Sequence, residues 1–85
     1  MVLALALELA PIRVNAVSPG WVDTPVWDQL ATPDVKNARM ADLASRLPAR
    51  RLGRPEDIAN AVAFLIADNF VTGTVLHVDG GFKME

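Results

Sequence analysis

Hydrophobic positions along the chain follow two spacings, one typical of strands and one typical of helices. Residues 12–18 are rich in Val and Ile and carry apolar side chains on both faces, and residues 74–79 form a second extended run. A strand that is apolar on both faces is covered on both sides, as in a parallel sheet. We expect the first strand to end at Ser18-Pro19-Gly20 and the second at Gly80-Gly81, because proline removes a backbone donor and glycine adopts conformations that other residues avoid.

Two strongly apolar segments are predicted to be helical. Residues 1–10 are almost all Ala, Leu and Glu, so we expect a helix that is buried on most sides and ends before Pro11. Residues 55–67 begin with Pro-Glu-Asp, a good helix start, and then place apolar side chains on two faces. A sheet covers one of these faces in this prediction, and a second subunit is the candidate for the other.

A long connection, residues 25–48, follows the first strand. It contains a short helical turn at residues 26–30 and then an amphipathic helix, with Thr32 at the N-cap and Pro33 at the first helical position. Because it is inserted after the carboxyl end of a strand, we interpret it as a lid. Strand, connection with a terminal helix, and strand form a βαβ unit with parallel strands.

Composition narrows the class of protein. Of the 85 residues, 52% are hydrophobic and 21% are charged, which indicates part of a larger body or a protomer with large buried contacts. The net charge of −2 argues against a nucleic-acid partner or an anionic membrane surface. With no Cys and one His, no metal site is expected. Residues 1–10 fit neither a signal peptide nor a membrane anchor, and we expect a cytoplasmic protein.

Four motifs, in the correct order and spacing, resemble the C-terminal third of the short-chain dehydrogenase/reductase family. They are Leu7-Glu8-Leu9-Ala10, then Arg13-Val14-Asn15 with Ser18-Pro19-Gly20, then Gly53-Arg54-Pro55-Glu56-Asp57-Ile58-Ala59, and finally Thr72-Gly73 with Val78-Asp79-Gly80-Gly81. The resemblance implies an α/β fold, the C-terminal part of a Rossmann-type doubly wound parallel sheet, in the order helix tail, strand, lid helices, helix, strand. Residues 1–85 would then be a single incomplete domain.

The family moves a hydride between NAD or NADP and a small-molecule carbonyl or alcohol, and is usually dimeric or tetrameric. Carried over to this sequence, the resemblance implies four cofactor-binding residues. Pro19 and Gly20 would let the backbone approach the nicotinamide, Val22 would offer its backbone to the carboxamide, and Thr24 its hydroxyl to the carboxamide or the adjacent phosphate. The segment 25–48 corresponds to the family's variable substrate lid.

The family's catalytic groups have no counterpart in this sequence. Its Gly-rich phosphate loop, its catalytic Ser and its Tyr-x-x-x-Lys pair are not matched, and the chain contains no Tyr. We therefore assign no catalytic residue and expect these 85 residues alone to be inactive. The alternative is a non-catalytic interaction module that associates with itself or docks on a full-length relative, since unpaired strand edges and apolar helix faces favour association.

Three further groups of residues bear on other functions. Ser18, His77 and Asp79 do not support a hydrolase, because Ser18 lacks a nucleophile elbow and His77 fits a structural or interface role better. The arginines at positions 46, 50, 51 and 54 are interpreted as a solvated turn that pairs with nearby acids. Trp21 and Trp27 flank the turn after the first strand, and the sequence leaves open whether they line a substrate pocket or cover the strand end.

Overall fold

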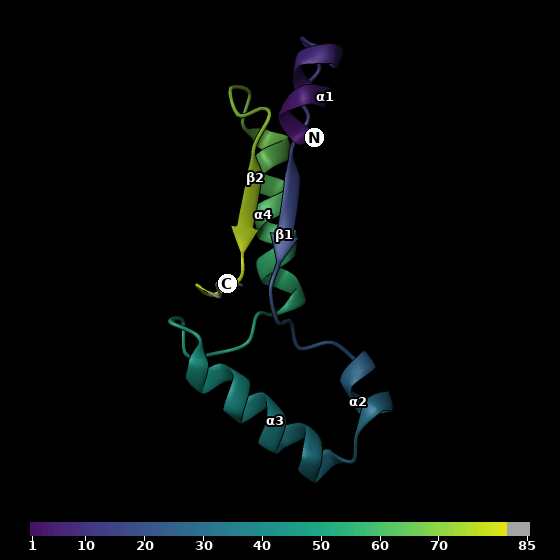
Figure 1. Cartoon of the computed structure of the whole chain (residues 1–85), viewed down its shortest axis with the longest axis vertical. Helices are drawn as coiled ribbons and strands as arrows, with labels where there is room; N and C mark the ends of the chain where they lie inside the picture. The colour runs from purple at the N-terminus through teal and green to yellow at the C-terminus, as the bar shows by residue number, and fades with distance from the viewer. Residues whose placement is uncertain (82–85) are drawn as a thin grey trace.

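A parallel pair of strands and the helix that connects them form the centre of the fold. The computed structural model describes residues 1–81. Its elements are α1 (Val2–Leu9), β1 (Ala16–Pro19), α2 (Val26–Leu30), α3 (Pro33–Arg46), α4 (Pro55–Ala67) and β2 (Val75–Val78). Figure 1 shows α4 behind the two strands, and α2 and α3 beyond the ends to which the strands point.

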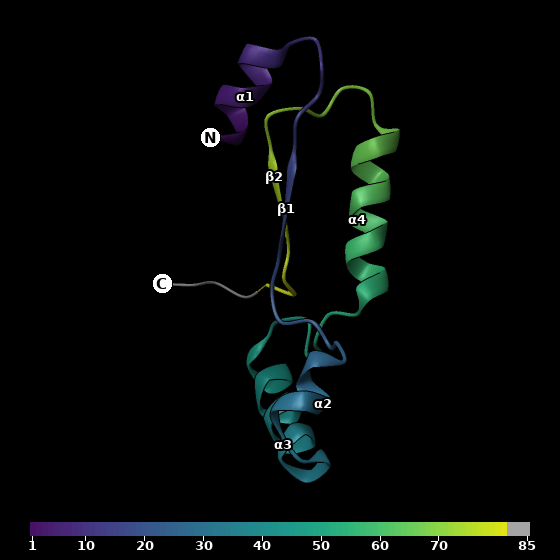
Figure 2. The same ribbon diagram turned by 90° about the vertical axis from the view of Figure 1, so that its right-hand side faces the viewer.

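The strands pair in parallel with a register that runs from Ala16 opposite Val75 to Pro19 opposite Val78. This confirms the predicted parallel βαβ unit and the α/β fold class. Figure 2 shows α4 packed on one face of the sheet, while α1 lies on the other face near the beginning of the strands. In the part of the chain that the structure describes, the side chains of Val75 and His77 are exposed.

The first strand is shorter than the hydrophobic pattern predicted, because it begins at Ala16 rather than at residue 12. Residues 13–15 use their polar groups to fix neighbouring loops instead. The Arg13 guanidinium donates to two carbonyl oxygens at the end of α4, Leu65 at 2.6 Å and Ile66 at 3.0 Å. These carbonyls lack partners within the helix, so Arg13 satisfies the helix end.

Asn15 plays the matching role for the loop before β2. Its amide nitrogen donates to the carbonyl oxygen of Val71 at 3.0 Å, and its amide oxygen accepts from the backbone N–H of Thr74 at 3.2 Å. The backbone N–H of Val14 donates to the Thr72 hydroxyl at 3.1 Å. The Arg-Val-Asn motif is therefore structural: it holds the end of α4 and the start of β2 in place.

The starts of the two longer helices agree with their sequence signals. Thr32 is the N-cap of α3 and Pro33 its first residue, although the Thr32 side chain makes no capping hydrogen bond. At α4, the Asp57 carboxylate accepts a hydrogen bond from the backbone N–H of Arg54 at 2.8 Å. This bond satisfies one of the free donors of the first helical turn.

The chain is elongated and leaves much apolar surface uncovered. Its radius of gyration is 15.9 Å, against about 12 Å for a compact chain of this length. It exposes 6403 Å², against about 4,900 Å² for a compact monomer of this mass. Only Ala6 of α1 is buried, so the expectation that this helix is buried on most sides is wrong for the described residues taken alone. The outer face of α4 is also exposed, with Phe64 at 53%.

Among residues 1–81, no helix combines the length and the apolar character needed to cross a bilayer. The same part of the chain contains no group of three or more His, Asp and Glu residues placed to hold a metal ion.

Candidate functional site: the loop after the first strand

The four predicted cofactor residues lie within one short loop at the carboxyl end of β1. Pro19 is the last residue of the strand, and Gly20, Val22 and Thr24 follow before α2 begins at Val26. In open α/β sheets, ligands bind outside the carboxyl ends of the strands. The loop therefore lies at the edge of the sheet where a ligand is expected.

Gly20 is needed for its lack of a side chain rather than for an unusual backbone conformation. The glycines with positive φ in the described chain are Gly73, Gly80 and Gly81, so the sequence-based reason given for Gly20 is wrong. A Cβ at Gly20 would lie 2.8 Å from the Cβ of Asp79, which follows β2. Its backbone N–H donates to the Val78 carbonyl at 3.3 Å. Gly20 thus lets the two strand ends pass closely.

Val22 is held from one side by Gly53, far along the chain. The Gly53 N–H donates to the Trp21 carbonyl at 2.9 Å, and the Asp23 N–H donates to the Gly53 carbonyl at 2.9 Å, which makes a single parallel bridge between Val22 and Gly53. Both bonds use the peptide groups that flank Val22. The N–H and C=O of Val22 itself therefore point away from Gly53.

The free edge of Val22 carries one donor and one acceptor. Among residues 1–81 the Val22 N–H has no hydrogen-bond partner, whereas its carbonyl oxygen accepts from the indole Nε1–H of Trp27 at 3.0 Å. A carbonyl oxygen has two lone pairs, so this one keeps capacity for a second donor. The sequence did not reveal this bond, because a spacing of five residues across a loop has no periodic signature.

Thr24 lies two residues before α2 begins and is half-buried. Its carbonyl oxygen accepts from the backbone N–H of Trp27 at 3.2 Å, and the Pro25 carbonyl accepts from Asp28 at 3.0 Å. The Thr24 hydroxyl makes no hydrogen bond within the described part of the chain. It remains available to a ligand.

The two tryptophans face each other above this loop. Their ring centroids are 6.0 Å apart and the planes are tilted by 55°, a favourable aromatic geometry. Trp27 comes from α2 and Trp21 from the loop, so the pair attaches the first helix of the 25–48 segment to the strand end.

The segment 25–48 is anchored at several points. Lys36 on α3 donates to Asp28 on α2 at 2.7 Å, and this bond raises the pKa of Lys36. After α3, the Ala49 N–H donates to the Gly80 carbonyl at 3.0 Å. A Cβ on Gly81 would lie 2.6 Å from the Pro48 ring, so the Gly80-Gly81 turn fits closely against the end of this segment.

Among residues 1–81, two of the four arginines of this turn pair with nearby acids, as the sequence predicted, whereas Arg50 donates to the Ser45 carbonyl oxygen. Arg51 donates to Asp57 at 2.7 Å, and Arg46 pairs with Asp42 at 3.0 Å. The Arg51 hydrogen bond, followed by that from the Arg54 backbone, lowers the pKa of Asp57 from 3.8 to about 2.

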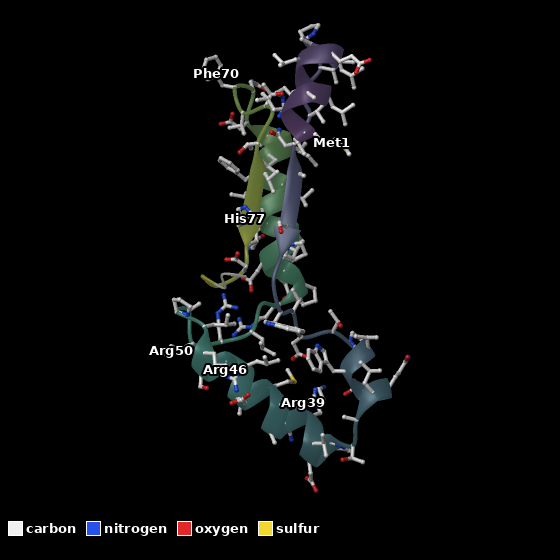
Figure 3. All side chains as sticks on the ribbon, in the orientation of Figure 1. Met1, Arg39, Arg46, Arg50, Phe70 and His77 are labelled. Atoms are coloured by element: carbon white, nitrogen blue, oxygen red, sulfur yellow. The ribbon has the colours of Figure 1, made fainter. Side chains whose placement is uncertain are left out.

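An open pocket of about 320 Å³ lies beside this turn, with Asp23 and Met40 in its lining. Figure 3 shows Arg46 and Arg50 around the C-terminal end of α3, whereas Phe70 lies near the top of the view.

The three residues considered for a hydrolase have structural roles. Ser18 and His77 are opposite each other in the strand register. The Asp79 carboxylate accepts from the backbone N–H of Gly81 at 3.0 Å and so shapes the turn after β2. Each of these three residues has a place in the sheet or its turn, so the structure gives no support to a triad.

Comparison with known proteins assigns the family. The family model described as enoyl-(acyl carrier protein) reductase matches residues 1–83. Subunit BbsD of (2S)-[(R)-hydroxy(phenyl)methyl]succinyl-CoA dehydrogenase from Thauera aromatica is 49% identical over 85 residues, which are 95% of this chain and 32% of that protein. The 3-oxoacyl-[acyl-carrier-protein] reductase FabG of Thermotoga maritima is 45% identical over 80 residues, 89% of this chain and 30% of the relative.

Solved structures give the same result. A small-chain dehydrogenase in complex with NADPH superposes with a TM-score of 0.83 at 44% identity, covering 94% of this chain and 36% of the other. A short-chain dehydrogenase/reductase from Brucella melitensis, described as glucose/ribitol dehydrogenase, gives 0.81 at 43% identity, over 100% and 34% of the two chains. The chain thus spans about one third of the length of these relatives. These comparisons favour the oxidoreductase interpretation over the interaction module, and the chain belongs to the short-chain dehydrogenase/reductase family.

Proposed function

We propose that these residues form the nicotinamide-facing wall of an NAD(P)-dependent oxidoreductase that acts on a small-molecule carbonyl or alcohol. Family membership supports the reaction class, and one similar structure holds NADPH. The observation that carries the proposal is the free edge of Val22, which offers one donor and one partly used acceptor at the carboxyl end of β1.

This edge fits a nicotinamide carboxamide. A primary amide presents a carbonyl acceptor and N–H donors in one plane, and an extended residue presents the complementary pair on one edge. The Val22 N–H would donate to the amide oxygen, and the Val22 carbonyl would accept from the amide nitrogen. When bound, the nicotinamide supplies or receives the hydride, and this chain's residues orient its ring.

The other predicted residues complete the wall. The Thr24 hydroxyl, which has no partner among residues 1–81, would bind the carboxamide or the adjacent phosphate, and the Pro19-Gly20 turn would let the backbone approach the nicotinamide. The segment 25–48, attached through the two tryptophans, would form the substrate lid. We assign to it the recognition of the small-molecule substrate.

Proton transfer needs groups that these residues do not provide. The chain has no Tyr, and the acid beside Val22 in the loop, Asp23, is exposed rather than enclosed in a site where it would protonate a carbonyl. We therefore propose that the 85 residues bind and orient but do not turn over by themselves. The exposed faces of α1 and α4 would contact a second copy or the remainder of a full-length relative.

Replacing Thr24 tests the proposed cofactor contact. In the protein that carries these residues, Thr24→Val should weaken NADPH or NADH binding, measured by nicotinamide fluorescence, about 3- to 12-fold, because one hydrogen bond is lost. Thr24→Ser keeps the hydroxyl and should restore most of the affinity. Unchanged affinity in Thr24→Val would refute this contact, and a wild-type protein that binds neither cofactor would refute the proposed function.

A further inference from the structure

Hydrogen bonds from two other parts of the chain fix the peptide groups on both sides of Val22. These two peptide units contain four polar groups: the Trp21 carbonyl, the Val22 N–H, the Val22 carbonyl and the Asp23 N–H. The Gly53 N–H donates to the Trp21 carbonyl, and the Asp23 N–H donates to the Gly53 carbonyl, each at 2.9 Å. Trp27 bonds the Val22 carbonyl at 3.0 Å. Three of the four groups are therefore fixed, and the Val22 N–H has no partner within residues 1–81.

Trp27 contacts both of the proposed polar binding residues. Its indole Nε1–H donates to the Val22 carbonyl, and its backbone N–H donates to the Thr24 carbonyl at 3.2 Å. One residue of α2 thus spans the loop from Val22 to Thr24. Its ring is half-buried and packs against Trp21, which limits the directions that the indole N–H can take.

We infer that Trp27 is a positioning residue for the cofactor's carboxamide. Its indole N–H occupies one lone pair of the Val22 carbonyl and fixes the plane of the peptide, so that the second lone pair points to the amide N–H of the cofactor. A group held in its binding geometry beforehand loses less entropy on binding. This inference rests on the proposed function, since it presupposes that Val22 binds a nicotinamide.

A double substitution cycle between protein and ligand tests the inference. In the ligand, 3-acetylpyridine adenine dinucleotide, or its phosphate, replaces the amide NH₂ by a methyl group, so the bond to the Val22 carbonyl is lost while the carbonyl oxygen that would accept from the Val22 N–H is kept. In the protein, Trp27 is replaced by β-(3-benzothienyl)alanine, which has sulfur instead of the indole N–H and nearly the same shape. Trp27→Phe is a second, genetically encoded variant.

Dissociation constants of the protein that carries these residues are measured by calorimetry for NAD(P) and its acetylpyridine analogue. The wild type should bind NAD(P) about 3- to 10-fold more tightly than the analogue, and removal of the indole N–H should reduce this ratio to below about 2. Gln29→Ala, on the exposed side of the same helix, should leave the ratio unchanged.

The outcomes separate the two proposals. A wild-type protein that binds neither ligand overturns the proposed function. A protein that binds both but shows no preference for the amide, or keeps its full preference without the indole N–H, overturns the role of Trp27 and leaves cofactor binding intact. If Trp27→Phe unfolds, the benzothienylalanine variant gives the answer alone, because it preserves the packing with Trp21.

Discussion

Gly20 and Asp79 pass so closely that a Cβ on Gly20 would lie 2.8 Å from the Cβ of Asp79 and 3.0 Å from its Cα. The contact joins the end of β1 to the end of β2. It places the loop that contains Val22 directly beyond the sheet. The glycine in the Pro19-Gly20 turn is therefore a packing requirement between two strand ends.

Gly20→Ala should separate these strand ends. Since the nearest atoms belong to backbone and Cβ, they cannot rotate away, and we expect a loss of about 1–3 kcal/mol in the free energy of unfolding. Urea-induced unfolding of the wild type and the variant measures this loss in the free energy of unfolding. Gly53→Ala is the matched control, because its added Cβ would make only ordinary contacts, 3.4 Å or longer, and it should cost clearly less. Equal losses in both variants would contradict this account.

Arg13 should contribute to stability through the end of α4. Arg13→Leu removes two charge-assisted hydrogen bonds to the Leu65 and Ile66 carbonyls, and we expect a loss of about 1–3 kcal/mol in the free energy of unfolding. Arg13→Lys keeps the charge near the helix end but cannot reach both oxygens in the same way, so it should lose less. Thermal denaturation followed by circular dichroism compares the stabilities of the two variants. If Arg13→Leu were as stable as the wild type, the carbonyls at the end of α4 would need no partner.

Because of Asp57, the free energy of unfolding should decrease at acidic pH. Its folded pKa, about 2, lies below its ordinary value of 3.8, so the carboxylate stabilises the folded state above pH 4. That contribution is lost as the pH falls from about 4 through 2. Asp57→Asn should therefore be less stable than the wild type at pH 6, and the difference should shrink toward zero at pH 2.

The neighbouring Glu56 provides the control for this prediction. Glu56→Gln removes the same charge from the same helical turn, but Glu56 has no ion pair in the part of the chain that the structure describes. Its effect should be small at both pH values. A difference between wild type and Asp57→Asn that stays constant from pH 6 to pH 2 would contradict the assignment to the Arg51 pair.

The exposed apolar faces should cause the 85-residue chain to associate. Leu7 on α1 is 72% exposed and Phe64 on α4 is 53% exposed, and such faces seek partners. Sedimentation velocity should show a sedimentation coefficient that increases with protein concentration, because larger oligomers form. Leu7→Glu and Phe64→Glu should each reduce this association, whereas Asn37→Glu, at an exposed polar position of α3, should not. A concentration-independent monomer would contradict the prediction.

Local signals in the sequence were sufficient for the helices and the topology. The prolines at 33 and 55 mark the starts of α3 and α4, and the two apolar runs pair as parallel strands. The strand start was placed too early, because Arg13 and Asn15 bond to loops that are distant in the sequence. Alternation of apolar residues cannot reveal such bonds.

In the candidate site, too, some features follow from local sequence signals and others depend on contacts in the folded chain. Its location after β1 followed from the Pro-Gly turn and the family motif. The reason for Gly20 and the pairing of Val22 with Gly53 depend on residues that meet only in the folded chain. The Trp27 bond to Val22 depends on how α2 is oriented, and no spacing rule in a loop predicts that orientation.

The crystal structure of the protein that carries these residues, in complex with NADPH or NADH, would show the proposed contacts to the nicotinamide themselves. The carboxamide oxygen should lie within hydrogen-bond distance of the Val22 N–H, about 2.7–3.2 Å, and the amide nitrogen beside the Val22 carbonyl. Trp27 should still donate to that carbonyl. A nicotinamide bound away from Val22, with the Val22 N–H facing solvent or another protein group, would contradict it.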